Sequence, residues 1–96
     1  MKEIMINFIK ISTMETNASS SWQVVPEGLY RKFKFKNFIE AFGFMTKVAF
    51  LAEKKNHHPT WTNSYNTVEI WLITHDAGNQ ITEKDQELSN LIDQIL

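Results

Sequence analysis

The sequence predicts an α+β fold, a four-stranded antiparallel sheet with helices packed on one face. Two segments alternate apolar and polar residues with a period of two around a turn, which is typical of β-hairpins. Each hairpin is followed by a segment whose apolar residues recur every three or four positions, as in an amphipathic helix. The order strand–strand–helix–strand–strand–helix over 96 residues fits one domain of two packed layers.

Two parts of the chain differ in composition. Residues 1–21 end in the small, polar run TMETNASSS, which indicates a variable or flexible N-terminal segment. Residues 22–96 contain the two hairpins and both helical segments, and we expect them to form the domain. The apolar start, MKEIMINFIKIS, is interrupted by Asn7 and Lys10, so it makes a poor membrane span and a poor signal peptide. A cytoplasmic protein is therefore expected.

The first hairpin is predicted to turn at Pro26-Glu27-Gly28, between WQVV and LYRKFKF. Its second strand alternates an apolar face, which also includes Arg31, with a face of lysine and tyrosine. The second hairpin is predicted over residues 61–65 and 68–74, with its turn at Asn66-Thr67. Both hairpins therefore supply a sheet with one face for a core.

The first helix is predicted from Phe38 to about Lys55, with Asn37 as its N-cap and Pro59 stopping it near His58. Its apolar stripe is expected to consist of Phe38, Ala41, Phe42, Met45, Val48, Ala49 and Ala52. Phe44, Phe50 and Leu51 lie outside that stripe, and a self-association surface would explain this excess of apolar residues.

The last helix is predicted to begin at Thr82, which forms a variant of the capping box with Asp85. Its apolar stripe is expected to consist of Leu88, Leu91, Ile92 and Ile95. The run DAGNQ before it is expected to be a loop.

Charge and composition exclude several classes of function. The formal net charge is −1, which gives no basic face of the kind that nucleic acid calls for. The chain has no cysteine, so disulfides and thiolate metal sites are excluded. No serine lies in the sequence context of an activated nucleophile.

Three histidines lie at the ends of predicted elements, His57 and His58 at the end of a helix and His75 after a strand. Such positions allow side chains to converge on a ligand, and imidazoles suit general acid–base chemistry near neutral pH. Glu53 lies one helical turn before His57, where it could hydrogen-bond the ring and orient it.

Structural interpretations compete with this one. A histidine near a helix C-terminus is favourable through the helix dipole alone, Trp61 could be a core residue, and Asp85 could serve only as a cap. A zinc triad is disfavoured, because adjacent histidines diverge and no HExxH spacing is present.

The segment AEKKNHHPTWTNSYNTVEIWLITHD resembles the signature of the pterin-4a-carbinolamine dehydratases. The resemblance extends over roughly residues 22–95, with Trp22 and FKFKNFIEAF upstream and Thr82 with Asp85 downstream. The pairing of His-His-Pro with Thr-His-Asp at this separation is highly specific. One departure is the loop Gly78-Asn79-Gln80-Ile81, which is one residue longer than the family's usual form, so one wall of the pocket is expected to differ.

The resemblance implies an α+β domain with a four-stranded antiparallel sheet and helices on one side. It also implies dehydration of 4a-hydroxytetrahydropterin to quinonoid dihydropterin in tetrahydrobiopterin recycling, without metal or cofactor. By position, it implies that catalysis rests on His57, His58 and His75, with Glu53 supporting His57. The substrate-binding residues that it implies are Pro59, Trp61, Thr74, Asp76, Ala77 and Asp85.

The expected partners are a pterin substrate and further copies of the chain, as a homodimer or homotetramer, with no nucleic acid and no membrane. Two other functions remain open at this point. One is a protein-binding coactivator module that uses helices, as some animal members of the family do. The other is a pterin-binding protein without turnover.

Overall fold

The computed structural model describes residues 22–96, and the predicted flexible segment 1–21 lies outside the described residues. The elements in chain order are β1 (Gln23–Val25), β2 (Gly28–Lys34), α1 (Phe38–Lys55), β3 (Thr60–Ser64), β4 (Thr67–Leu72), the short 3-10 helix η2 (His75–Ala77) and α2 (Glu83–Gln94). Within these residues, no helix is both long and apolar enough to cross a bilayer.

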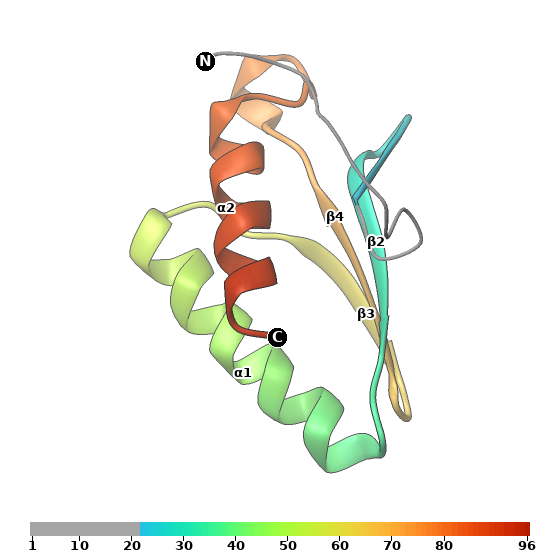
Figure 1. Ribbon diagram of the computed structural model, residues 1–96. Helices are drawn as coiled ribbons and strands as arrows, with labels where there is room; N and C mark the ends of the chain where they lie inside the picture. Colours follow the sequence, from blue (N-terminus) through green and yellow to red (C-terminus); the bar gives the residue numbers. More distant parts are fainter. Residues whose placement is uncertain (1–21) are drawn as a thin grey trace.

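The sheet has four strands in the order β1-β2-β4-β3, and every neighbouring pair is antiparallel. Both helices lie on the same face of this sheet, and Figure 1 shows them side by side to the left of the strands. Within residues 22–96, the opposite face of the sheet has no helix over it. The predicted fold class is confirmed.

Gly28 at the first turn has a physical reason that the sequence alone did not give. Its φ of 124° lies in the left-handed region, and a Cβ at this position would stand 2.2 Å from the carbonyl oxygen of Leu72 on β4. The backbone of β2 and that of β4 therefore meet without space for a side chain.

The second hairpin turns one residue earlier than predicted, at Tyr65 and Asn66, so the expected turn at Asn66-Thr67 is wrong. Tyr65 has a φ of 53°, and Thr67 already pairs with Ser64 as the first residue of β4. Asn66 is bound to the end of β2, because Phe35 N donates to Asn66 O at 2.8 Å and Asn66 Nδ2 donates to Phe35 O at 2.9 Å. These contacts between separate hairpins set the turn.

The buried stripe of α1 is rotated from the one predicted. Its buried residues are Ala41, Phe44, Val48 and Ala52. Phe44 packs on Phe33 and Phe35, with ring centroids 4.8 and 4.9 Å apart, whereas Phe38 and Phe42 are 47% and 55% exposed. The helix has apolar residues on more than one side, so the aromatic residues of β2 decide which side is buried.

The remaining predictions for the core are largely confirmed. Asn37 caps α1 by accepting from Glu40 N, and the capping box of α2 is present. Leu88 and Ile92 of α2 are fully buried, while Met45 and Ile95 are partly buried against the core. Leu51 also packs against the core, so its expected place outside the core stripe is wrong. The face of β4 that packs under the helices supplies Val68, Ile70 and Leu72.

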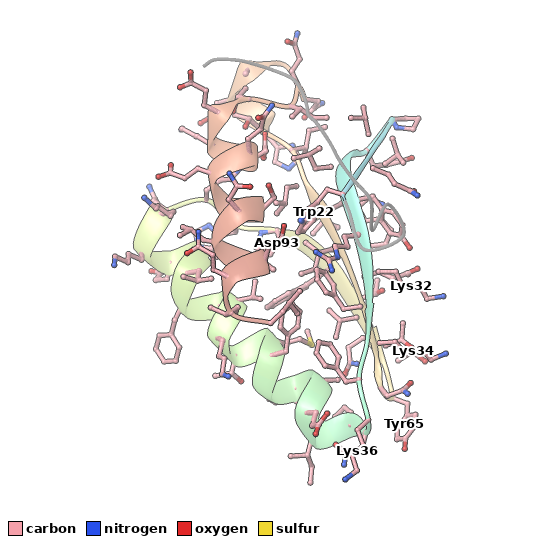
Figure 2. The ribbon with its side chains drawn as sticks, viewed as in Figure 1. Trp22, Lys32, Lys34, Lys36, Tyr65 and Asp93 are labelled. Atoms are coloured by element: carbon pink, nitrogen blue, oxygen red, sulfur yellow. The ribbon has the colours of Figure 1, made fainter. Side chains whose placement is uncertain are left out.

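Arg31, the charged residue on the inner face of β2, is neutralised from α2. Its guanidinium donates to Asp93 Oδ1 at 2.7 Å, and Trp22 Nε1 donates to the same oxygen at 2.9 Å. Figure 2 shows Trp22 and Asp93 meeting between β2 and α2, while Lys32 and Lys34 point away from the helices. Burial raises the pKa of the Asp93 carboxyl above its usual value of 3.8, against the lowering effect of the bonds from Trp22 and Arg31.

This shift predicts how stability depends on pH. The folded protein takes up the Asp93 proton at a higher pH than the unfolded chain does. The contribution of this carboxyl to the free energy of unfolding therefore falls as the pH rises from 3.8 through the folded-state pKa, and is constant above it. The effect is modest, because the Asp93 side chain is 38% exposed.

In Asp93→Asn, this contribution is absent. We expect the melting temperature of the variant, relative to that of the wild type, to rise as the pH is raised from about 4 to 6, the region just above the usual aspartate pKa. Thermal unfolding of both proteins across that range measures it. If the melting temperature of the variant instead fell relative to that of the wild type as the pH rose, the direction of the pKa shift would be contradicted.

Candidate active site

An open hollow of about 190 Å³ lies where the C-terminal end of α1, the end of β4 and the first turn of α2 meet. It is lined by Asn56, His57, His58, Ile73, Thr74, His75, Asp76 and Lys84. The structure therefore brings the three histidines together, although 16 residues lie between His58 and His75 in the sequence.

The first two histidines follow the C-terminal end of α1. Asn56 adopts the left-handed conformation with a φ of 51°, and its N–H donates to the carbonyl oxygens of Ala52 and Glu53. The N–H of His57 donates to Ala52 O at 3.0 Å, and after Pro59 the chain continues into β3. The left-handed cap thus turns the chain out of the helix just before the histidines.

His57 is held by a carboxylate from α2. Its Nε2 lies 2.6 Å from Asp85 Oδ1, and the His57 side chain is only 10% exposed while that of Asp85 is completely buried. A carboxylate only accepts hydrogen bonds, so Nε2 is the protonated nitrogen of this contact. The contact fixes the orientation of the ring and leaves Nδ1 as its other nitrogen.

Asp85 is the centre of a buried polar network. Its second oxygen, Oδ2, accepts from Thr74 Oγ1 at 2.7 Å and from the N–H of Thr82 at 2.8 Å. The hydroxyls of Thr74 and Thr82 are themselves 2.6 Å apart. Asp85 is thus both the N3 residue of the capping box, with Thr82 as N-cap, and the hydrogen-bond partner of His57. Its complete burial places it behind the histidine, away from the surface of the hollow.

Glu53 supports His58, and the expectation that it supports His57 is wrong. Glu53 Oε1 lies 2.9 Å from His58 Nε2, on the solvent side of the site, where the two side chains are 82% and 57% exposed. The spacing of one helical turn does not extend past Asn56, because the left-handed cap sends the His57 ring inward, toward α2.

His75 opens η2 and is held from the loop that follows. Its Nδ1 lies 2.8 Å from Asn79 Oδ1. The surroundings of His57 and His75 therefore differ. His57 is bound through Nε2 to a buried carboxylate, whereas His75 is exposed and bound through Nδ1 to an amide.

The other residues that the sequence predicted for the site fall into three places. Thr74 and Asp76 line the hollow with the histidines, and Ala77 lines an adjoining hollow that shares both of them. Pro59 follows His58 directly, at the entry to β3. Trp61 lies on β3 and packs, partly buried, against the hydrophobic core rather than lining the hollow.

Sequence reasoning did not assign four residues to this site, Asn56, Ile73, Lys84 and Asn79. Lys84 lines both hollows from the first turn of α2, and Asn79 binds His75. Lys84 could have been found from its position two residues after the cap Thr82, on the turn that faces the end of β4. Asn79 had no signal, because its loop has no periodicity.

Within residues 22–96, no three histidine, aspartate or glutamate side chains are grouped so that they could hold a metal ion. His57 and His58 point to different partners, Asp85 and Glu53, which agrees with the expectation that adjacent histidines diverge. The site therefore presents imidazoles, a lysine and a carboxylate to a ligand, arranged for proton transfer and hydrogen bonding.

Known proteins are similar to this chain in sequence and in fold. A family model described as Pterin 4 alpha carbinolamine dehydratase matches residues 9–95. A protein of Prochlorococcus marinus (strain NATL2A), named "Putative pterin-4-alpha-carbinolamine dehydratase", is 45% identical over 94 residues, 96% of this chain and 98% of that protein. A protein of the same name from strain MIT 9312 is 54% identical over 74 residues, 77% of this chain and 76% of that protein.

A solved structure is also similar to this chain. The crystal structure titled "transcriptional coactivator/pterin dehydratase from Brucella Melitensis" is 45% identical to this chain, with a TM-score of 0.74. The match covers 81% of this chain and 84% of that one. The chain therefore belongs to the pterin-4-alpha-carbinolamine dehydratase family of hydro-lyases.

Proposed function

We propose that the protein dehydrates 4a-hydroxytetrahydropterin to quinonoid dihydropterin by histidine general acid–base catalysis, in the recycling of tetrahydrobiopterin. The observation that supports this most is the convergence of His57, His58 and His75 on one hollow. Each ring is bound through one nitrogen to a polar side chain, so each can present its other nitrogen to a substrate.

The proposed reaction needs one acid and one base. The C4a–O bond breaks and the hydroxyl leaves as water with a proton from an imidazolium. N5 loses its proton to a neutral imidazole, and its electron pair forms the C4a=N5 double bond. Carbon is neither oxidised nor reduced overall, so proton transfers are all that the side chains have to supply.

The contacts suggest a division of roles. His57 is the proposed acid, because the buried Asp85 carboxylate at 2.6 Å compensates the charge of an imidazolium. His75 is the proposed base, because its contact with Asn79 leaves Nε2 for the N5 proton. His58, supported by Glu53, lies at the solvent side and is proposed to assist proton exchange with water.

Substrate binding is proposed to use the backbone on both sides of the hollow. The segment from His57 to Pro59 and the segment from Thr74 to Ala77 would face the amide-like edge of the pterin. Thr74 and Asp76 line the hollow, which supports a direct role for them. Trp61 is proposed to act indirectly, by packing the start of β3 against the core.

The direct test is an absorbance assay with synthetic 4a-hydroxytetrahydropterin, compared with its spontaneous loss of water. We expect clear acceleration by the protein, and the same rate after extensive treatment with a chelator, since the proposal uses no metal and no cofactor. A protein that binds the pterin without accelerating the reaction would leave only the pterin-binding alternative. A rate that disappears on chelation and returns with zinc would overturn acid–base catalysis by histidine alone.

Assembly into a homodimer or homotetramer is part of the proposal, supported by the outer helix face, which we define as Phe38, Ile39, Phe42 and Phe50. These four residues of α1 are 47%, 79%, 55% and 74% exposed. They lie outside the buried stripe of the helix, and large exposed apolar patches mark interaction surfaces. The same face would serve a protein partner in a coactivator role, which is the alternative function.

The variant Phe50→Glu tests the assembly. We expect it to dissociate the oligomer with little change in melting temperature, because Phe50 is 74% exposed in the single chain. The matched control is Phe44→Glu, which places a charge in the core, where Phe44 is 5% exposed, and should unfold the protein. Light scattering and thermal unfolding separate the two effects. A wild-type chain that is monomeric at micromolar concentration would defeat the proposal.

A further inference from the structure

The loop after His75 has a role beyond connecting β4 to α2. We infer that Asn79 is a positioning residue that holds His75 in the Nδ1–H tautomer and so presents the Nε2 lone pair to the hollow. The part of this inference that concerns catalysis rests on the proposed function, whereas the part that concerns the tautomer does not.

The loop is folded so that Asn79 returns to His75. Thr74 and Gln80 form an isolated antiparallel bridge, with Thr74 N donating to Gln80 O at 2.9 Å and Gln80 N donating to Thr74 O at 3.3 Å. Between them, η2 is closed by Gly78, whose N–H donates to His75 O at 3.1 Å. The chain therefore reverses within this loop and places residue 79 beside residue 75.

The backbone at this point favours very few residue types. Gly78 and Asn79 are both left-handed, with φ values of 77° and 59°. Among residues with a side chain, asparagine and aspartate adopt this region most readily. Glycine would satisfy the backbone at least as well, so the backbone alone does not account for an amide at residue 79.

The amide does have a specific contact, since Asn79 Oδ1 lies 2.8 Å from His75 Nδ1. An amide oxygen only accepts, so Nδ1 must donate, and a neutral imidazole with a proton on Nδ1 has none on Nε2. A free histidine side chain in water prefers its proton on Nε2. The contact with Asn79 therefore reverses the usual tautomer.

The reversed tautomer has a consequence at the hollow. The side chains that share this space with His75 and can carry charge are His57, His58, Asp76 and Lys84. His57 is bound through Nε2 and His75 through Nδ1, so the two rings offer opposite nitrogens to anything bound between them. For His75 this is the outer nitrogen, farther from the backbone, which is the one that can reach a proton on a ligand.

The experiment combines two variants of Asn79 with a control next to it. Asn79→Gly keeps a residue that adopts the left-handed backbone and removes the acceptor, whereas Asn79→Asp keeps an acceptor at the same distance from the backbone. Gln80→Ala is the control, because the hydrogen bonds that Gln80 forms with other residues of the described part of the chain involve its backbone. Long-range 15N–1H spectra of histidine-labelled protein, recorded without substrate at a pH where His75 is neutral, report which nitrogen carries the proton.

We expect the Nδ1–H form of His75 in the wild type, in Asn79→Asp and in Gln80→Ala, and a shift toward Nε2–H in Asn79→Gly. In the dehydration assay, Asn79→Gly should lower kcat by about fivefold, the scale of one hydrogen bond, and leave KM nearly unchanged. Gln80→Ala should leave both constants unchanged.

The outcomes separate this inference from the proposed function. If His75 has the same tautomer in the wild type and in Asn79→Gly, the inference is overturned, whatever the assay shows. If the tautomer changes but kcat does not, the catalytic part of the inference is overturned. If the tautomer changes and the wild type has no dehydratase activity, positioning by Asn79 stands and the proposed function falls.

Discussion

Replacing His57 or His75 is expected to slow dehydration by about 10²–10³-fold, the usual contribution of a general acid or base. The two rings line the same hollow from different elements, and each is held by its own partner, Asp85 or Asn79. In the proposed mechanism, loss of either ring removes one of the two proton transfers. The measurement is kcat and KM for His57→Gln and His75→Ala, together with circular dichroism and thermal unfolding.

The choice of glutamine at His57 has a structural reason. The Asp85 carboxylate is completely buried, and His57→Ala would remove one of its donors. Glutamine can still donate to Asp85 but cannot exchange a proton near neutral pH, so it isolates the chemistry from the packing. His58→Ala is the comparison, with a smaller expected effect, because this ring is 57% exposed at the rim. Wild-type rates in His57→Gln and His75→Ala, with the native fold retained, would refute the assignment of acid and base.

Asp85→Ala is expected to have the largest effect on stability, a loss of about 3–5 kcal/mol in the free energy of unfolding. Asp85 accepts from His57, from the hydroxyl of Thr74 and from the N–H of Thr82. Its removal takes away a helix cap and leaves these donors without their acceptor in a site that excludes water. Denaturant unfolding measures the loss, which should also appear as a fall in activity, since His57 loses its support.

Glu83→Ala is the matched control for this substitution. Glu83 is the first residue of α2 and is exposed, so its loss should change stability by less than about 0.5 kcal/mol. Asp85→Asn adds a finer comparison, because it keeps one acceptor oxygen and should fall between the two. If Asp85→Ala were as stable as Glu83→Ala, the buried network would not hold the ends of α1, β4 and α2 together.

The fold could be predicted from the sequence because its signals are local. Period-two and period-3.6 patterns gave the two hairpins and the two helices, and Asn37 and Thr82 marked where the helices begin. The buried side of α1 could not be predicted in the same way. Apolar residues occur on several sides of this helix, and Phe44 is buried by its contacts with Phe33 on β2 and with Phe35, which follows β2.

The same distinction applies to the site. The sequence marked His57, His58 and His75 as a group because each lies at the end of an element. It offered Asp85 as a cap, and the family resemblance implied that Asp85 binds substrate. It paired Glu53 with His57 because residues four apart are neighbours on a helix. The left-handed Asn56 ends that rule one residue before His57, and the ring turns instead to Asp85, 28 residues further along the chain.

The sequence by itself determined the elements of this protein, their order and the identity of its three histidines, because backbone preference and periodicity act between near neighbours. Only the tertiary structure decided which partner each histidine has. Those partners are Asp85 for His57, Glu53 for His58 and Asn79 for His75. The contact of His57 with Asp85, 28 residues apart in the sequence, depends on how α1 and α2 pack together. The contacts of His58 and His75 depend on the left-handed turns at Asn56 and at Gly78-Asn79, which periodicity does not predict.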